Sequence, residues 1–405
     1  MKTNLRRTLS LFEVTVSGVG IILGAGIYAL IGEAAGLAGN AVWISFALSA
    51  LVAVFTGLSY AELASMFPRA SAEYEYTYQA FGQLPAFLIG WLITFSGIVG
   101  AATVSLGFAG YFRALTGIAI LPSALLLLAA LSLIILLGIK QSARIAIALT
   151  AIEVLGLALI ILVGIPYLGR VNLLELSPLG YSGIFQASAL IFFAFIGFAE
   201  VVKLSEEAKD PEKNIPRGLI LAISASIVLY ILVAISSVSI LGWEELSRSS
   251  APFSDIAYSA LGPNASSIMS LIALCATINT VLLMLLASSR IIYGMAQSGS
   301  LPSFLAAVHG RTQAPWTATL ISGILAMSFV FLGDIAFVAN VNNFTVFVTF
   351  IAINAALIVL RIQKPQIKRP FKVPLSWGRL ALLPVAGIFF NAFMLAQLDG
   401  QVYAI

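Results

Sequence analysis

The sequence predicts an all-α polytopic membrane protein, and three observations support this fold class. Of the 405 residues, 60% are hydrophobic and only 9% are charged, and the mean hydropathy is +1.04. A soluble fold could not accommodate so much apolar area, because its surface must stay largely polar. Apolar runs of about twenty residues, each long enough to cross a bilayer as a helix, recur along nearly the whole chain. The runs are continuous rather than alternating, which excludes a transmembrane β-barrel.

We predict eleven transmembrane helices joined by short loops, with no soluble domain between them. They cover residues 10–36, 40–66, 84–112, 121–138, 143–167, 184–204, 217–241, 263–297, 315–332, 335–361 and 379–397. No cleavable signal peptide is expected, because the apolar segment that follows residues 1–7 is too long and lacks a cleavage site.

The distribution of basic residues predicts the orientation. With a cytoplasmic N-terminus, only Arg113, Arg170 and Arg248 of the 21 Lys and Arg residues fall outside, which leaves 18 inside and satisfies the positive-inside rule. The pI of about 9.1 therefore reflects orientation, and no nucleic-acid partner is expected. We expect an integral protein of the cell (plasma) membrane. An odd number of helices places the C-terminus outside, unless a twelfth helix is missing from this sequence.

The first predicted helix contains the stretch GVGIILGAGIYALIG, residues 18–32, in which five of fifteen residues are glycine. Each glycine weakens a helix by about 1 kcal/mol relative to alanine. One explanation is close helix packing, since Gly20 and Gly24 have small-xxx-small spacing. The tight cluster Gly24-Ala25-Gly26 favours the other explanation, a break in the helix.

A second interrupted helix is predicted five helices later. The segment at 184–204 contains Gly197 near mid-membrane and Glu200 three residues on. Broken helices at corresponding positions of two halves are typical of inverted-repeat transporters. We therefore predict one transporter domain over 1–405: a first repeat at about 10–167, a second at about 184–361 and an accessory helix at about 379–397. This prediction depends on topology and on the two breaks, since no convincing residue-level repeat is visible.

Five motifs resemble the amino acid–polyamine–organocation (APC) transporter superfamily. They are GAGIYALIG (24–32), GLSYAELASMFPRASAEYEYTYQAFG (57–82), EEAKDPEKNIPRGL (206–219), RIIYGMAQSGSLP (290–302) and RPFKVPL (369–375). The likeness is greatest to the cationic amino acid transporter branch and its prokaryotic permease relatives. The resemblance implies a five-plus-five inverted-repeat fold that moves amino acids or related amines by alternating access.

The resemblance also implies a substrate site at the two breaks. The amides of Ala25 and Gly26 would bind a carboxylate, with Gly24 permitting the bend, since a helix N-terminus suits an anion. The carbonyls of three residues in the other break would bind an ammonium group: Phe193, Ala194 and Ile196. Glycine would leave room for the ligand to approach the backbone.

Side-chain selectivity is expected to come from residues around the breaks. The candidates are Phe193, Phe195 and Ile196, with Ile22, Ser96, Gly97 and Ala101 as weaker ones. For the apolar members, ordinary helix packing is the alternative. The predicted helix at 84–112 has no acidic residue, which favours a neutral or small apolar substrate.

Acidic residues inside membrane helices are functional hypotheses, because a buried charge is costly. Glu153 lies ten residues into its helix, about 15 Å from the cytoplasmic end. Three roles remain open for it: proton coupling, ligation of a cation together with Thr277, Asn279 or Thr280, or a permanently neutral hydrogen-bond donor. Several members of the superfamily that the chain resembles have a lysine at this place.

Four further acidic residues lie within predicted helices. Glu200 follows the second break and is a candidate second proton site or gate contact. Glu13, Glu33 and Glu62 lie near helix ends, where solvation or a local ion pair is the simpler explanation. Glu62 belongs to the YAEL motif, so a structural or gating role at the inner mouth is expected.

The predicted function is secondary active transport, most simply proton-coupled symport of neutral amino acids. The alternatives are an amino acid or amine exchanger, a sodium-coupled symporter and, from a different class, a channel; a filter sequence for a channel is not visible. An ATP-driven pump is excluded because the sequence has no GxxxxGK[ST] loop. No enzyme, cofactor or metal site is expected, because Cys275 and His309 are the sole cysteine and histidine. The oligomeric state is left open.

Overall fold

The protein is a bundle of long apolar helices. The computed structural model describes residues 9–69, 72–136, 143–297, 299, 301–309 and 314–404. In chain order the α-helices are α1 (Leu11–Ile22), α2 (Gly26–Ala38), α3 (Val42–Met66), α4 (Ala72–Phe81), α5 (Gln83–Thr116), α6 (Ile120–Leu136), α7 (Ala143–Gly164), α8 (Gly180–Ile191), α9 (Phe198–Val201), α10 (Pro211–Arg248), α11 (Pro252–Leu261), α12 (Pro263–Gln297), α13 (Trp316–Val330), α14 (Ile335–Gln363) and α15 (Leu382–Leu395).

Short 3-10 helices join or extend these elements. They are η1 (Gly39–Ala41), η2 (Ile165–Tyr167), η3 (Phe192–Phe195), η4 (Val202–Glu206), η5 (Ser303–Ala306) and η6 (Gly400–Ala404). Strands β1 (Ser376–Trp377) and β2 (Leu380–Ala381) pair as a small antiparallel hairpin.

The helices confirm the predicted class, an all-α polytopic membrane protein. Among the described residues, seven stretches are long and apolar enough to span a bilayer: Gly26–Met66, Gln83–Thr116, Leu149–Tyr167, Gly180–Glu206, Pro211–Arg248, Pro263–Gln297 and Ile335–Gln363. Four shorter apolar helices are Leu11–Ile22, Ile120–Leu136, Trp316–Val330 and Leu382–Leu395. Each of the eleven predicted apolar segments coincides with one or two of these helices.

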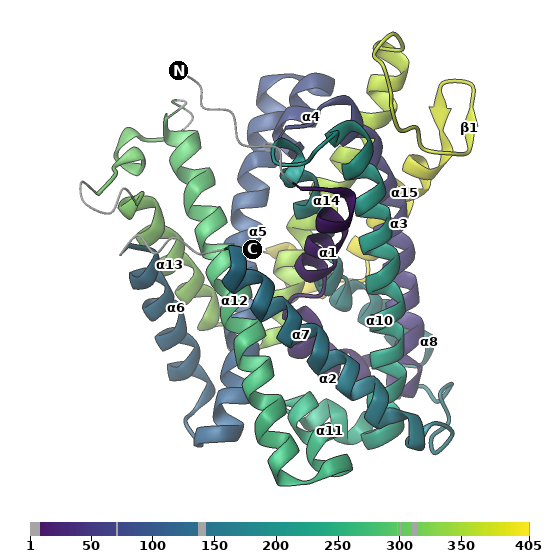
Figure 1. The fold of residues 1–405 in the computed structure, drawn as a ribbon, viewed down its shortest axis with the longest axis vertical. Helices are drawn as coiled ribbons and strands as arrows, with labels where there is room; N and C mark the ends of the chain where they lie inside the picture. The colour runs from purple at the N-terminus through teal and green to yellow at the C-terminus, as the bar shows by residue number, and fades with distance from the viewer. Residues whose placement is uncertain are drawn as a thin grey trace.

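Among the elements that were not predicted from the sequence, two α-helices and the hairpin lie at the two ends of the bundle. Helix α4 and the β1–β2 hairpin lie at one end, and α11 lies at the other (Figure 1). Both helices have only ten residues, too few to span a bilayer, so a search for transmembrane segments passes over them. Proline begins α11 and Gly262, with φ +89°, ends it, as is usual for helix boundaries.

Both predicted helix breaks are present. The first transmembrane helix is divided into α1 and α2 by residues 23–25, which we call the first break. The sixth is divided by residues 192–197, the second break: α8 gives way to η3, then to a turn at Ile196 and Gly197, and then to α9 and η4. In Figure 1, α1 and α2 lie in the middle of the bundle. The breaks are therefore enclosed by other helices, where freed backbone groups need partners from the protein or from a ligand.

Candidate functional site

The two breaks pack backbone against backbone, and two glycines make this possible. A Cβ on Gly26 would lie 2.8 Å from the Cα of Ala194, and one on Gly197 would lie 2.3 Å from the carbonyl oxygen of Ile21. At these two positions glycine leaves room for the opposite break, while the interpretation that glycine leaves room for a ligand stays a prediction. At Gly24 the nearest atom, Thr280 Oγ1, would be at an ordinary 3.5 Å.

A tyrosine missed in the sequence links the two breaks. The hydroxyl of Tyr230, on α10, lies 2.6 Å from the carbonyl oxygen of Ile22 and 3.0 Å from that of Ala194. Its single O–H proton lies between a carbonyl at the end of α1 and one inside η3, so it can be shared between the two breaks. Its ring is fully buried and contacts Phe195 edge-on at 5.1 Å. Tyr230 therefore satisfies carbonyls that the breaks leave without helical partners.

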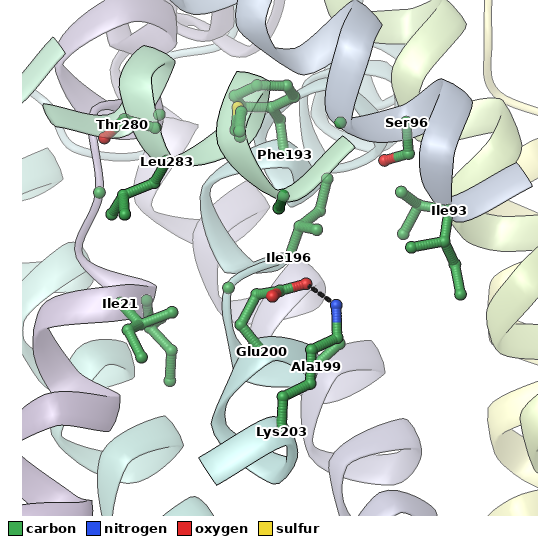
Figure 2. Close-up of a pocket in the computed structure, with 18 of the residues that line it drawn as sticks. Ile21, Ile93, Ser96, Phe193, Ile196, Ala199, Glu200, Lys203, Thr280 and Leu283 are labelled. Carbon is green, nitrogen blue, oxygen red and sulfur yellow. Dashed lines mark hydrogen bonds and ion pairs between the residues drawn. The ribbon is translucent and has the colours of Figure 1, made fainter. Parts of the chain in front are cut away.

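A cavity of about 440 Å³ lies beside the breaks. Figure 2 shows Ile21 and Thr280 on one side, Ser96 and Ile93 on the other, and Phe193 and Ile196 between them. Further lining residues come from α7, α12 and α14 and include Glu153, Asn279, Met284 and Asn342. The lining also extends to Lys203, Leu204 and Arg290. The cavity therefore runs from the breaks toward the end of the bundle where α4 lies.

Most of the residues predicted to bind substrate meet at this cavity. Its lining includes Ile22, Gly24, Ala25, Gly26, Ser96, Phe193, Ala194 and Ile196, together with Gly97. These residues come from segments far apart in the sequence, so the fold brings together what the motifs indicated separately.

Two predicted substrate residues do not line the cavity. Ala101 is fully buried within α5, and Phe195 is buried to 1% exposure with its ring against Tyr230. The reason is local geometry: a 3-10 helix turns 120° per residue instead of 100°, so side-chain directions cannot be extrapolated through η3. The Phe195 ring therefore packs against Tyr230 and does not line the cavity.

Three of the five backbone groups predicted to bind substrate have protein partners: the Ala25 amide and the carbonyls of Ala194 and Ile196. The Ala25 amide donates to Thr280 Oγ1 over 3.3 Å. The Ala194 carbonyl accepts from Tyr230, and the Ile196 carbonyl accepts from the Ala199 amide at 3.1 Å. Each carbonyl keeps a second lone pair, so these contacts orient the groups and leave acceptor capacity on the carbonyls.

Glu153 lies in the cavity wall with a mere 2% of its surface exposed. Among the described residues its Oε1 has no hydrogen-bond partner. Its backbone carbonyl accepts from Tyr28, on α2, at 2.8 Å, which fixes α7 against the first broken helix. An unpartnered buried carboxyl is expected to be neutral or to await a cation.

The predicted cation site is only partly assembled. Asn279 and Thr280 line the cavity with Glu153. Thr277 does not, because its hydroxyl donates back to the carbonyls of Ala273 and Leu274 in its own helix. The hydroxyl of Thr280 contacts both the first break and the Ala276 carbonyl.

Glu200 differs from Glu153 in having a cationic partner. Lys203, three residues on, forms an ion pair with it (Figure 2). Glu73 from α4 lines the same part of the cavity and accepts from Tyr60 at 3.4 Å. Burial raises the pKa of the Glu73 carboxyl, and the charge of Lys203 opposes this effect. The end of the cavity nearest α4 is therefore lined by charged side chains.

Glu62 does not line the cavity and instead forms a buried ion pair with Arg361. Its carboxylate is buried and accepts from two nitrogens of Arg361, with Arg369 Nε at 3.2 Å. It also accepts from the Val373 amide at 2.7 Å. This cluster joins α3 to α14 and to the segment before β1. Of the other acidic residues near helix ends, Glu13 forms a capping box with Ser10 at the start of α1.

A helical membrane protein whose two broken helices meet at a buried cavity has the architecture of a membrane transporter. Comparison with known proteins identifies which kind. The chain belongs to the amino acid permease family, whose model matches residues 9–402, within the APC superfamily.

Three relatives illustrate the range of the family. The branched-chain amino acid permease BcaP of Bacillus subtilis is 32% identical over 98% of this chain and 89% of its own length. The methylthioribose transporter of the same organism is 33% identical over 92% of this chain and 85% of its own. Human cationic amino acid transporter 4 is 32% identical over 90% of this chain, which spans 61% of the human protein.

Proposed function

We propose that this protein is a secondary active transporter that moves neutral amino acids by alternating access, coupled to protons through Glu153. One observation supports this most: the two breaks share a single cavity with the buried carboxyl of Glu153, whose Oε1 has no hydrogen-bond partner among the described residues. The breaks supply oriented backbone groups for a zwitterion. The carboxyl supplies a group that can bind and release a proton.

A neutral side chain fits the far wall of the cavity better than a cationic one. That wall, the side with Ser96 and Ile93 in Figure 2, includes the hydrogen-bonded pair Ser96–Asn342 at 2.7 Å. The apolar residues Leu283, Met284 and Val346 also line the cavity. None of these described residues is acidic, so none could balance a substrate cation after desolvation. A branched-chain or other apolar amino acid matches this surface, and BcaP transports such substrates by its name.

The orientation and the repeats belong to the same proposal. We place the end with α4 and the hairpin in the cytoplasm, α11 outside and the protein in the plasma membrane. The cavity then extends toward the cytoplasm, as in an inward-facing state. Residues 10–167 and 184–361 form the inverted repeats, with α15 as the accessory helix, and each repeat begins with one broken helix.

The first test is uptake into proteoliposomes made with the purified protein. Radiolabelled amino acids are screened without sodium, with and without an inward proton gradient, and methylthioribose is included. We expect uptake of an apolar amino acid that rises with the gradient. Uptake that occurs only into vesicles preloaded with unlabelled amino acid would show an exchanger. Uptake that occurs only when sodium is added would show a sodium symporter. Unsaturable flux would indicate a channel.

Replacing Glu153 with glutamine is expected to abolish the response to the gradient. The amide has nearly the shape of a neutral carboxyl but cannot bind and release a proton, so uptake should persist without stimulation. Glu212→Gln, at the exposed start of α10, removes the same charge elsewhere and should retain full stimulation. If Glu153→Gln responds to the gradient like the unmodified protein, the coupling group is Glu200 or another residue.

A further inference from the structure

The last turn of α8 is capped by side chains of other helices. An α-helix leaves its last four carbonyls without intrahelical partners. Here the Phe192 amide still donates to the carbonyls of Ser188 and Leu190, and the Ser188 carbonyl also accepts from the Ser49 hydroxyl, on α3, at 2.7 Å. The next two, Ala189 and Leu190, accept from the same amide nitrogen of Asn343, on α14, at 2.8 and 2.9 Å. The end of α8 is thus satisfied before the second break begins.

The chemistry of Asn343 matches this position. The residue is fully buried, and its amide group has two N–H donors on one nitrogen, one for each neighbouring carbonyl. In the part of the chain that the structure describes, its Oδ1 has no hydrogen-bond partner. The hydrogen bonds of this side chain to the end of α8 therefore use its N–H donors.

The two carbonyls are the ones that decide whether the sixth helix is continuous. In an uninterrupted α-helix, Ala189 O would accept from the Phe193 amide and Leu190 O from the Ala194 amide. Donors from Asn343 compete for these acceptors. They reduce the advantage of closing the helix, so the chain follows η3 and turns at Gly197 instead.

We propose that Asn343 is a positioning residue that keeps the sixth helix broken and so orients the carbonyls of Phe193 and Ile196 toward the cavity. The inference rests on the proposed function, in which these carbonyls bind the substrate ammonium group. The preceding residue, Asn342, accepts from Ser96 in the cavity wall. Helix α14 thus contacts the second break through one asparagine and the far wall through the other.

Asn343→Asp tests this proposal because it keeps the shape and removes both N–H donors of the amide, leaving at most the one O–H of a neutral carboxyl. Asn354→Asp is the matched control: Asn354 lies on the same helix, is equally buried, and donates to Thr56, on α3, and to the Phe350 carbonyl of its own helix. Both variants are reconstituted with the full chain. Uptake kinetics, thermal stability and amide hydrogen exchange by mass spectrometry are then measured.

We expect Asn343→Asp to raise the KM for the transported amino acid about 10-fold, with a smaller change in Vmax, because two hydrogen bonds that position binding groups are lost. Exchange should change within residues 189–197 and little elsewhere. Asn354→Asp should lose comparable thermal stability with KM and exchange at 189–197 unchanged.

The proposal would be overturned if the KM of Asn343→Asp stayed within about twofold of that of the unmodified protein. Such a change corresponds to less than about 0.5 kcal/mol of binding free energy. An equal KM rise in Asn354→Asp, or no exchange change at 189–197, would also overturn it. If the unmodified protein takes up no amino acid, the proposed function fails instead. The exchange measurement needs no substrate and then decides the role of Asn343 by itself.

Discussion

Gly197→Ala is expected to abolish uptake. The added methyl would lie 2.3 Å from the Ile21 carbonyl oxygen and 2.9 Å from the Ile22 Cα. Both contacts are with backbone, which cannot rotate away, so the two breaks must separate. A displacement of about 1 Å at a site that depends on geometry costs about 100-fold in rate. Initial uptake rates in proteoliposomes, normalised to folded protein, measure the effect.

The control for this prediction is Gly294→Ala. Gly294 lies within α12, and a Cβ there would meet nothing within 4 Å. Alanine should even favour the helix by about 1 kcal/mol, so uptake should be retained. Uptake by Gly197→Ala at more than about half the unmodified rate would show that the close approach of the breaks is unnecessary.

Glu62→Gln is expected to destabilise the protein by about 3–5 kcal/mol, because removing one partner of a buried ion pair leaves an uncompensated charge. Arg361 is 4% exposed, so water cannot replace the lost carboxylate. Arg369 loses the same partner. The measurement is the thermal unfolding midpoint in detergent, together with the yield of monodisperse protein.

Glu212→Gln again removes one negative charge, here from an exposed position, and should leave the midpoint unchanged. The double variant Glu62→Gln/Arg361→Met should recover part of the loss, because the unpaired guanidinium is also removed. Equal midpoints for Glu62→Gln and the unmodified protein would contradict a stabilising role for the cluster.

The sequence was sufficient for the class of protein and for the position of both breaks. Hydropathy shows the spans directly, and the cluster Gly24-Ala25-Gly26 marks a place where a helix is weak. The resemblance then indicated the part of the cavity wall that the two breaks form. The apolar spans, the glycine cluster and the motifs can be recognised in the sequence because each is a pattern of consecutive residues.

The rest depends on contacts between distant parts of the chain. Asn343 meets α8 about 150 residues away in sequence, and Arg361 meets Glu62 across 299 residues. The sequence shows Tyr230, Asn343 and Arg361 as ordinary members of apolar or terminal helical segments. Phe195 was a candidate because it lies beside the second break, but nearness in sequence does not give the direction of a side chain, and its ring packs against Tyr230.

Competition binding tests the central claim most directly, namely that the two breaks together recognise both charged groups of an amino acid. A radiolabelled amino acid found in the uptake screen is displaced from purified protein by three compounds: itself, the amine without its carboxylate, and the acid without its ammonium group. We predict that both truncated analogues bind at least about 100-fold more weakly, because each leaves oriented polar groups unpaired. Displacement by either analogue as effective as that by the amino acid would contradict the account.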